Sequence, residues 1–149
     1  MSYTQLYIHV VIVVKRRIMA IPPSVERHIY SYIISILKER GVYVVQINGI
    51  PNHIHMLLRI PSTVCVADLV RDVKRATSLM MKNTLRLTSF EGWSAEYAAF
   101  TVSKGVVERV INYIRNQKEH HLKLSFEDEF MKMLEPEEQA NYNVGNFDK

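Results

Sequence analysis

The sequence predicts an α+β protein with the ferredoxin-like order β-α-β-β-α-β-α, an antiparallel sheet with helices packed on one face. Four runs rich in β-branched and aromatic residues alternate with runs whose apolar residues recur at helical spacing. Two of the strand runs follow each other with only a turn between them. The 149 residues contain no repeat, linker or low-complexity tract, so we expect a single domain over residues 1–149.

The first strand and the first helix are marked by their composition and their ends. Residues 6–14 (LYIHVVIVV) are typical of a strand buried on both faces. Ser24 follows two prolines and is expected to be the N-cap of a helix that begins at Val25. Gly41 ends this helix.

The remaining elements follow from the same signals. We expect strands at 42–47, 54–60 and 93–102 and helices at 66–83 and 106–122. Asn48-Gly49 predicts a hairpin-type turn, which Pro51-Asn52 extends. A short acidic tail is expected from about residue 123, with one more helical turn near 130–134.

Charge is distributed unevenly along the chain. The net charge is +4, but residues 123–149 hold three lysines and seven acids, so residues 1–122 carry +8. A basic body suits a polyanionic partner, although many proteins of this pI bind no nucleic acid. Cys65, the single cysteine, excludes an internal disulfide and is expected to be a buried small side chain. The longest apolar run is too short for a membrane helix and the start lacks a basic leader, so we expect a cytoplasmic protein without a membrane partner.

The His-x-His pattern His53-Ile54-His55 is a candidate half of a metal site. Side chains at i and i+2 of a strand point to the same face, so the two imidazoles converge while Ile54 faces away. Paired neutral imidazoles bind divalent metals. Such a pair also arises by chance near turns, so the pattern alone does not decide.

Tyr113 and Gln117 lie four residues apart in the last predicted helix and therefore share a face. A tyrosine hydroxyl can attack a phosphate, but its ordinary pKa near 10 means that it needs a metal to stabilise the developing charge. Gln117 offers a carbonyl oxygen as a third ligand. The alternative is that Tyr113 packs in the core and Gln117 is a solvated helix residue.

Together these motifs resemble a known family. The run from Ile50 to Leu58 is similar to the His-hydrophobe-His motif of the HUH nucleases, and Tyr113-x-x-x-Gln117 after an aromatic strand resembles the single-tyrosine HUH transposases. These are small insertion-sequence transposases and their repeat-associated relatives. The resemblance covers about residues 6–130 in the right order.

The resemblance implies a specific chemistry. Members are homodimers with a ferredoxin-like core that bind single-stranded DNA bearing a hairpin and use Mg²⁺ or Mn²⁺. The tyrosine attacks the phosphate, forms a 5′-phosphotyrosine link and frees a 3′-hydroxyl, and a second strand end later reverses the step. Carried over, His53, His55 and Gln117 are the metal ligands and Tyr113 is the nucleophile. Two imidazoles suit Mn²⁺ better than Mg²⁺.

Other residues have weaker signals. Candidate DNA contacts are basic residues after the first strand, Lys15, Arg16 and Arg17, and in the second helix, Lys74, Arg75 and Lys82. The three residues of the helix are equally consistent with a solvated surface. Tyr97 and Phe100 suit either base stacking or packing at a dimer seam. His120 and His121 are expected to be solvent-exposed at a helix end, although His121 is also conceivable as a fourth ligand.

Three functions remain open at this point. The leading hypothesis is a DNA strand-transferase that nicks and rejoins. The second is a nucleic-acid hairpin-binding protein that does not cut, either a domesticated transposase or a module like the RNA-binding domains that share this topology. The third is a metal-dependent phosphodiesterase that uses water in place of Tyr113.

Overall fold

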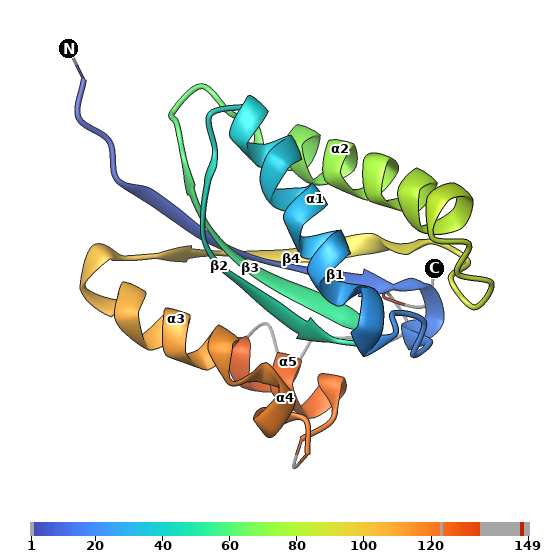
Figure 1. Ribbon diagram of the computed structural model, residues 1–149. Helices are drawn as coiled ribbons and strands as arrows, with labels where there is room; N and C mark the ends of the chain where they lie inside the picture. The colour runs from blue at the N-terminus through green and yellow to red at the C-terminus, as the bar shows by residue number, and fades with distance from the viewer. Residues whose placement is uncertain (1, 123, 135–146, 148–149) are drawn as a thin grey trace.

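A computed structural model describes residues 2–122, 124–134 and 147 and contains one four-stranded antiparallel sheet (Figure 1). The strand order is β2-β3-β1-β4, and each neighbouring pair is antiparallel. The strand bounds are β1 Leu6–Val14, β2 Tyr43–Ile50, β3 His53–Ile60 and β4 Trp93–Val102. This order is the ferredoxin-like arrangement that the sequence predicts, so the fold class is confirmed.

Helices α1 (Glu26–Glu39) and α2 (Val66–Leu79) cover one face of the sheet (Figure 1). Alternate residues of β1, such as Val10 and Ile12, point to this face and pack in the main core. α1 contributes buried isoleucines at helical spacing, including Ile29, to the same core. Burial of these side chains is the main stabilising contribution to this half of the molecule.

The opposite face is covered by α3 (Val107–Arg115), α4 (Gln117–His120) and α5 (Phe126–Met133). The other residues of β1, Val11 and Val13, pack against Phe126 and Phe130 of α5. β1 is therefore apolar on both faces, as its unbroken hydrophobic run indicates. The expectation that the helices share one face holds for α1 and α2 only, because the C-terminal helices form a second layer.

The described part of the predicted acidic tail contains a packed helix. α5 begins after Ser125, whose side chain accepts a hydrogen bond from the backbone N–H of Asp128. Residues 135–146 and 148–149 of the predicted tail lie outside the described residues. In the described ranges no helix is long and apolar enough to cross a bilayer.

Several local expectations are wrong in detail. Ser24 lies in a 3₁₀ turn at Pro23–Val25 and forms no side-chain cap, and Cys65 is exposed at the start of α2. Asn48 and Gly49 continue β2, and the turn lies at Pro51-Asn52 instead. The residues at 48 and 49 stay in the strand because they pair with His55 and Ile54.

Two predicted helices are not regular α-helices over their whole length. The helix expected at 66–83 is α-helical to Leu79 and π-helical at Met80–Thr84. The last predicted helix breaks at Asn116, which separates α3 from α4. This break lies between Tyr113 and Gln117 and therefore changes how their side chains are directed.

Gly49 is required by the close approach of β2 to β3. A Cβ added at Gly49 would overlap the carbonyl oxygen of His53 and lie 2.9 Å from the Cα of Ile54. We expect Gly49→Ala to lower the free energy of unfolding by about 2–3 kcal/mol, because backbone atoms must move apart. Chemical denaturation measures this, with Gly105→Ala as the control because a Cβ there meets no atom within 4 Å. Equal stability of the two variants would contradict the close approach.

Candidate metal and nucleophile site

β3 directs His53 and His55 to the face that α3, α4 and α5 cover. Both imidazoles are 0% exposed, and their ring centroids lie 5.0 Å apart. Ile54 points to the opposite face, where it belongs to the main core. The strand periodicity expected from the sequence therefore brings the two histidines together.

The C-terminal end of α3 is fixed to β2 by Asn48. The Asn48 side-chain N–H₂ donates to the carbonyls of Ile114 at 3.1 Å and Arg115 at 2.9 Å, which belong to the last turn of the helix. The Lys118 ammonium donates to Asn48 Oδ1 at 2.8 Å. These bonds position the helix break directly beside the histidine pair.

The break brings Tyr113 and Gln117 of the same chain to its own histidines. The Tyr113 ring lies 5.8 Å from the His55 ring and 6.2 Å from that of His9, measured between centroids. Gln117 is fully buried, and its Oε1 has no hydrogen-bond partner within residues 2–122, 124–134 and 147. All four residues predicted for the chemistry thus lie together.

Glu129 of α5 lies at the centre of this group, although the sequence reasoning did not identify it. Its side chain is 2% exposed. Oε1 lies 2.9 Å from His55 Nε2 and 3.4 Å from His53 Nε2. Oε2 accepts from Gln117 Nε2 at 3.1 Å and lies 3.1 Å from His121 Nε2. Phe126, Glu129, Phe130 and Met133 have helical spacing, and this pattern could have indicated that Glu129 faces inward.

His121 also differs from expectation. Its side chain is 5% exposed, and its ring lies 4.6 Å from that of His53. The expected solvent-exposed position is therefore wrong for His121. The cause is the turn after α4, in which His121 Nδ1 donates to the carbonyl of Leu124 at 2.8 Å and directs the ring inward.

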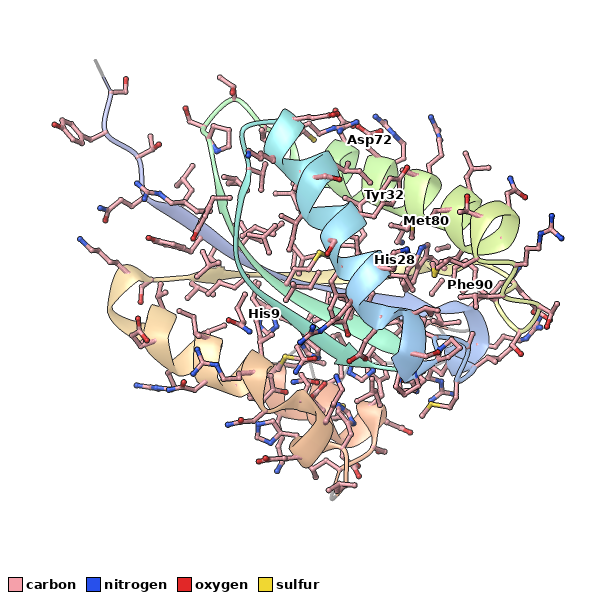
Figure 2. All side chains as sticks on the ribbon, in the orientation of Figure 1. His9, His28, Tyr32, Asp72, Met80 and Phe90 are labelled. Atoms are coloured by element: carbon pink, nitrogen blue, oxygen red, sulfur yellow. The ribbon has the colours of Figure 1, made fainter. Side chains whose placement is uncertain are left out.

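Two further side chains contact the histidine pair from outside. His9 of β1 lies on the side of the sheet that α3 covers (Figure 2), and its Nε2 is 2.8 Å from His55 Nδ1. Asn52 Oδ1 is 2.6 Å from His53 Nδ1. Such partners orient ligand imidazoles and fix their tautomers. The pairing register of β1 with β3, which the sequence alone does not show, places His9 beside His55.

Burial controls the protonation of the site. Burial lowers the pKa of His9 to about 3, with a smaller contribution from the nearby His55. Burial likewise lowers the pKa of His55 to about 4 and lowers the pKa of His53. Burial opposes ionisation of Glu129, but the adjacent imidazoles of His121, His53 and His55 outweigh it and hold the pKa of the carboxyl far below its usual range.

The Tyr113 phenol is neutral in this environment. Burial raises the pKa of Tyr113, and the adjacent Glu129 carboxylate raises it further. Negative charge on the phenol oxygen is therefore disfavoured in the metal-free site. A nucleophilic role requires compensating positive charge nearby.

Metal-free protein should lose stability in mild acid. A histidine whose pKa in the folded protein lies below 6.5 binds fewer protons in the folded than in the unfolded state. Its contribution to the free energy of unfolding is therefore complete above pH 6.5 and is lost as the pH falls toward 4. We expect a loss of about 1.4 kcal/mol per pH unit for each of His9 and His55. Denaturant unfolding between pH 7 and 4.5 measures this slope.

A matched pair of variants shows whether His9 contributes to the slope of the free energy of unfolding against pH. His9→Gln removes one buried imidazole and should reduce the slope by about 1.4 kcal/mol per pH unit. His28→Gln, at an exposed position on α1, should leave it unchanged (Figure 2). Identical slopes in the wild type and the His9 variant would contradict the assignment to His9.

The donor atoms of this site fit a divalent metal. Ligand atoms of His53, His55 and Glu129 all lie within 4.8 Å of one another. His53 Nε2, Gln117 Oε1 and His121 Nε2 are buried without a hydrogen-bond partner among the residues that the structure describes. Unsatisfied buried acceptors are costly, and a cation bound among them would satisfy them.

The six basic residues predicted to contact DNA gather near the start of β4. Lys15, Arg16 and Arg17 form a 3₁₀ turn after β1, in which the backbone of Arg16 and Arg17 is left-handed and Arg16 pairs with Glu91. The Lys74 ammonium donates to the Ser94 carbonyl at 2.8 Å, so Lys74 is engaged in holding α2 against β4. Arg75 and Lys82 are exposed. DNA contact by these six residues stays a prediction.

The two aromatics of β4 are partly buried in the chain itself. Tyr97 packs against the main core, and its ring lies 5.4 Å from the Lys74 ammonium. Phe100 packs against the α5 cluster and lies 6.3 Å from His9. Base stacking or a dimer seam at these two residues stays a prediction.

Comparison with known proteins identifies the family. The model of the family described as "Transposase IS200 like" matches residues 2–117. No curated protein sequence matches significantly.

Two solved structures share the fold. A protein described as a candidate transposase, from Deinococcus radiodurans R1, is 23% identical with a TM-score of 0.63, covering 78% of this chain and 93% of its own. A REP-associated tyrosine transposase bound to a REP hairpin is 13% identical with a TM-score of 0.62, covering 81% of this chain and 72% of its own. With the family model matching most of its length, the chain belongs to the IS200-like, single-tyrosine HUH transposase family.

Proposed function

We propose that this transposase is a single-strand DNA endonuclease and strand-transferase with Tyr113 as its nucleophile and His53, His55 and Gln117 as metal ligands. The observation that carries the proposal is the convergence of these four side chains in one buried site of one chain. The ion would be Mg²⁺ or Mn²⁺, and the imidazole ligands favour Mn²⁺.

The reaction is an in-line transesterification. Tyr113 Oη attacks the scissile phosphorus, and the bond to the 3′ oxygen breaks. The phenol gives up its proton as the new bond forms, and the departing 3′ oxygen takes one up. The product is a 5′-phosphotyrosine ester and a free 3′-hydroxyl, and attack by another 3′-hydroxyl reverses the step and rejoins DNA. When bound, the metal supplies positive charge that polarises the phosphate and favours the ionised phenol.

The substrate we propose is single-stranded DNA with a hairpin. A hairpin is bound by the structurally similar REP-associated transposase, and this chain has a basic body of +8 over residues 1–122. We also propose a homodimer, as the resemblance implies. The position of Tyr113 and Gln117 beside the histidines of their own chain supports a site formed in cis.

A covalent adduct tests the proposal. Purified protein is incubated with end-labelled hairpin DNA from the flanks of the gene, with Mn²⁺, and separated on a denaturing protein gel. A shifted, nuclease-sensitive band is expected, and EDTA should remove it.

Two other outcomes point to the competing functions. Tight hairpin binding without cleavage under any divalent ion would contradict the strand-transferase and support a hairpin-binding protein. Cleavage without any adduct would indicate a phosphodiesterase that uses water. A Tyr113 ester detected at any time excludes both.

A further inference from the structure

We infer that His121 and Glu129 are additional ligands of the divalent metal, so that the segment after the tyrosine helix completes the metal site. This inference rests on the proposed function, because it concerns the same ion. It adds an imidazole and a carboxylate to the ligands His53, His55 and Gln117. α4 and α5 thereby become part of the catalytic centre.

The first argument is the tautomer of His121. Its Nδ1 lies 2.8 Å from the Leu124 carbonyl oxygen, which only accepts hydrogen bonds, so Nδ1 carries the hydrogen. In the neutral imidazole Nε2 then bears a lone pair, and this atom points to Glu129 at 3.1 Å. A backbone carbonyl bound to one ring nitrogen, with the other facing inward, is the arrangement typical of a ligand histidine.

His53 repeats this arrangement. Its Nδ1 lies 2.6 Å from the Asn52 side-chain oxygen, which is also an acceptor, so Nδ1 carries the hydrogen of the neutral ring. Nε2 then carries a lone pair directed at Glu129 Oε1, which lies 3.4 Å away. Two lone pairs therefore face one carboxylate. These contacts are repulsive unless a positive charge lies between the atoms.

The charge of Glu129 is the second argument. A carboxylate with 2% exposure costs several kcal/mol unless it is paired. Among the described residues, its polar neighbours are histidines, Gln117 and the Tyr113 hydroxyl, with no lysine or arginine. A divalent cation satisfies the carboxylate, the two imidazole lone pairs and the unpaired Gln117 Oε1 together.

The third argument is that α5 is built to hold Glu129 in place. Phe126 and Phe130, on either side of it, pack into the cluster formed with Val11 and Val13 of β1. Their rings lie 5.8 Å apart, and Phe126 also contacts the His53 ring at 5.1 Å. The carboxylate is thus fixed by apolar packing, as a preorganised ligand requires.

The resulting ligand set has a chemical preference. Three imidazoles with one carboxylate and one amide oxygen favour Mn²⁺ over Mg²⁺, which takes oxygen ligands and keeps several waters. We therefore expect Mg²⁺ in large excess to displace little bound Mn²⁺ from the wild-type protein.

Direct Mn²⁺ binding, without DNA, tests the inference. Free Mn²⁺ is quantified by its electron paramagnetic resonance signal during titration of the wild type, Glu129→Gln and His121→Gln. Each variant should bind Mn²⁺ at least about tenfold more weakly. Glu127→Gln, at an exposed position on the same helix, and His28→Gln are the matched controls and should bind within about twofold of the wild type.

Unchanged affinity in both site variants overturns the inference, and so does tighter binding by Glu129→Gln, which would mean that Glu129 obstructs the site. Absence of Mn²⁺ binding by the wild type overturns it as well. Because altered packing can also weaken binding, electron spin echo spectroscopy of Mn²⁺ on wild-type protein labelled with ¹⁵N-histidine counts the coordinated imidazoles. Three are expected, and two would exclude His121.

The proposed function has a separate readout. Adduct formation by Tyr113 with unchanged Mn²⁺ affinity in the two variants would refute the extra ligands and leave the transferase intact. Absence of an adduct with the wild type, together with weaker Mn²⁺ binding by the two variants, would refute the strand-transferase and leave the extra ligands intact.

Discussion

Tyr113→Phe is expected to abolish the covalent DNA adduct, with a loss of strand cleavage on the order of 10⁴-fold or more, because the variant has no oxygen to attack the phosphorus. The measurement is the rate of adduct formation on labelled hairpin DNA with Mn²⁺. Hairpin affinity should change little, since the aromatic ring and its contacts with His55 and His9 remain.

The matched control for this variant is Tyr43→Phe. Tyr43 is 67% exposed on β2 and pairs with Arg59, toward the end of β3 away from His53, so the same hydroxyl deletion is made outside the site. It should form the adduct at the wild-type rate. An adduct that persists in Tyr113→Phe would show that another group is the nucleophile.

Replacing either HUH histidine should have the next largest effect. We expect His53→Gln and His55→Gln each to lower the adduct rate by more than about 100-fold in Mn²⁺, because each removes a fully buried imidazole from the proposed metal site. The loss should be partly offset by raising the Mn²⁺ concentration, since weaker metal binding is the cause. Adduct rates across a Mn²⁺ titration measure both effects.

His28→Gln is the control for the histidine variants, because His28 is exposed on α1, across the sheet from the site (Figure 2). It should follow the wild-type titration curve. A wild-type rate in His53→Gln or His55→Gln at low Mn²⁺ would contradict a metal role for that residue.

The elements that follow simple periodicity could be predicted from sequence. β1 and β4 have the expected bounds, because an unbroken β-branched run and an aromatic run each mark a strand clearly. The two histidines converge because i and i+2 share a face whatever the tertiary structure. Tyr113 and Gln117 lie with them, although a helix break at Asn116 separates the pair.

The missed features depend on tertiary contacts. Asn48-Gly49 has the composition of a hairpin turn, yet the Asn48 amide caps α3 and Gly49 lies against the backbone of β3. Both contacts need the folded chain, so local turn propensity gave the wrong position. Tertiary packing overrides such weak local preferences.

Glu129 and His121 show the same limit at the site. Glu129 follows two other acids, Glu127 and Asp128, and the three together have the composition of a charged, solvated tail. Only the helical spacing of the neighbouring Phe126 and Phe130 indicates that Glu129 faces inward. The inward direction of His121 depends on its hydrogen bond to the Leu124 carbonyl, which no sequence pattern specifies. The inward positions of both side chains therefore depend on tertiary contacts that the sequence does not show.

Identification of the residue esterified to DNA tests the central claim most directly. Wild-type protein is reacted with hairpin DNA and Mn²⁺, digested with nuclease and protease, and the modified peptide is sequenced by tandem mass spectrometry. The account predicts a nucleotide joined through its 5′-phosphate to Tyr113. A nucleotide on any other residue, or cleaved DNA with no modified peptide, would contradict it.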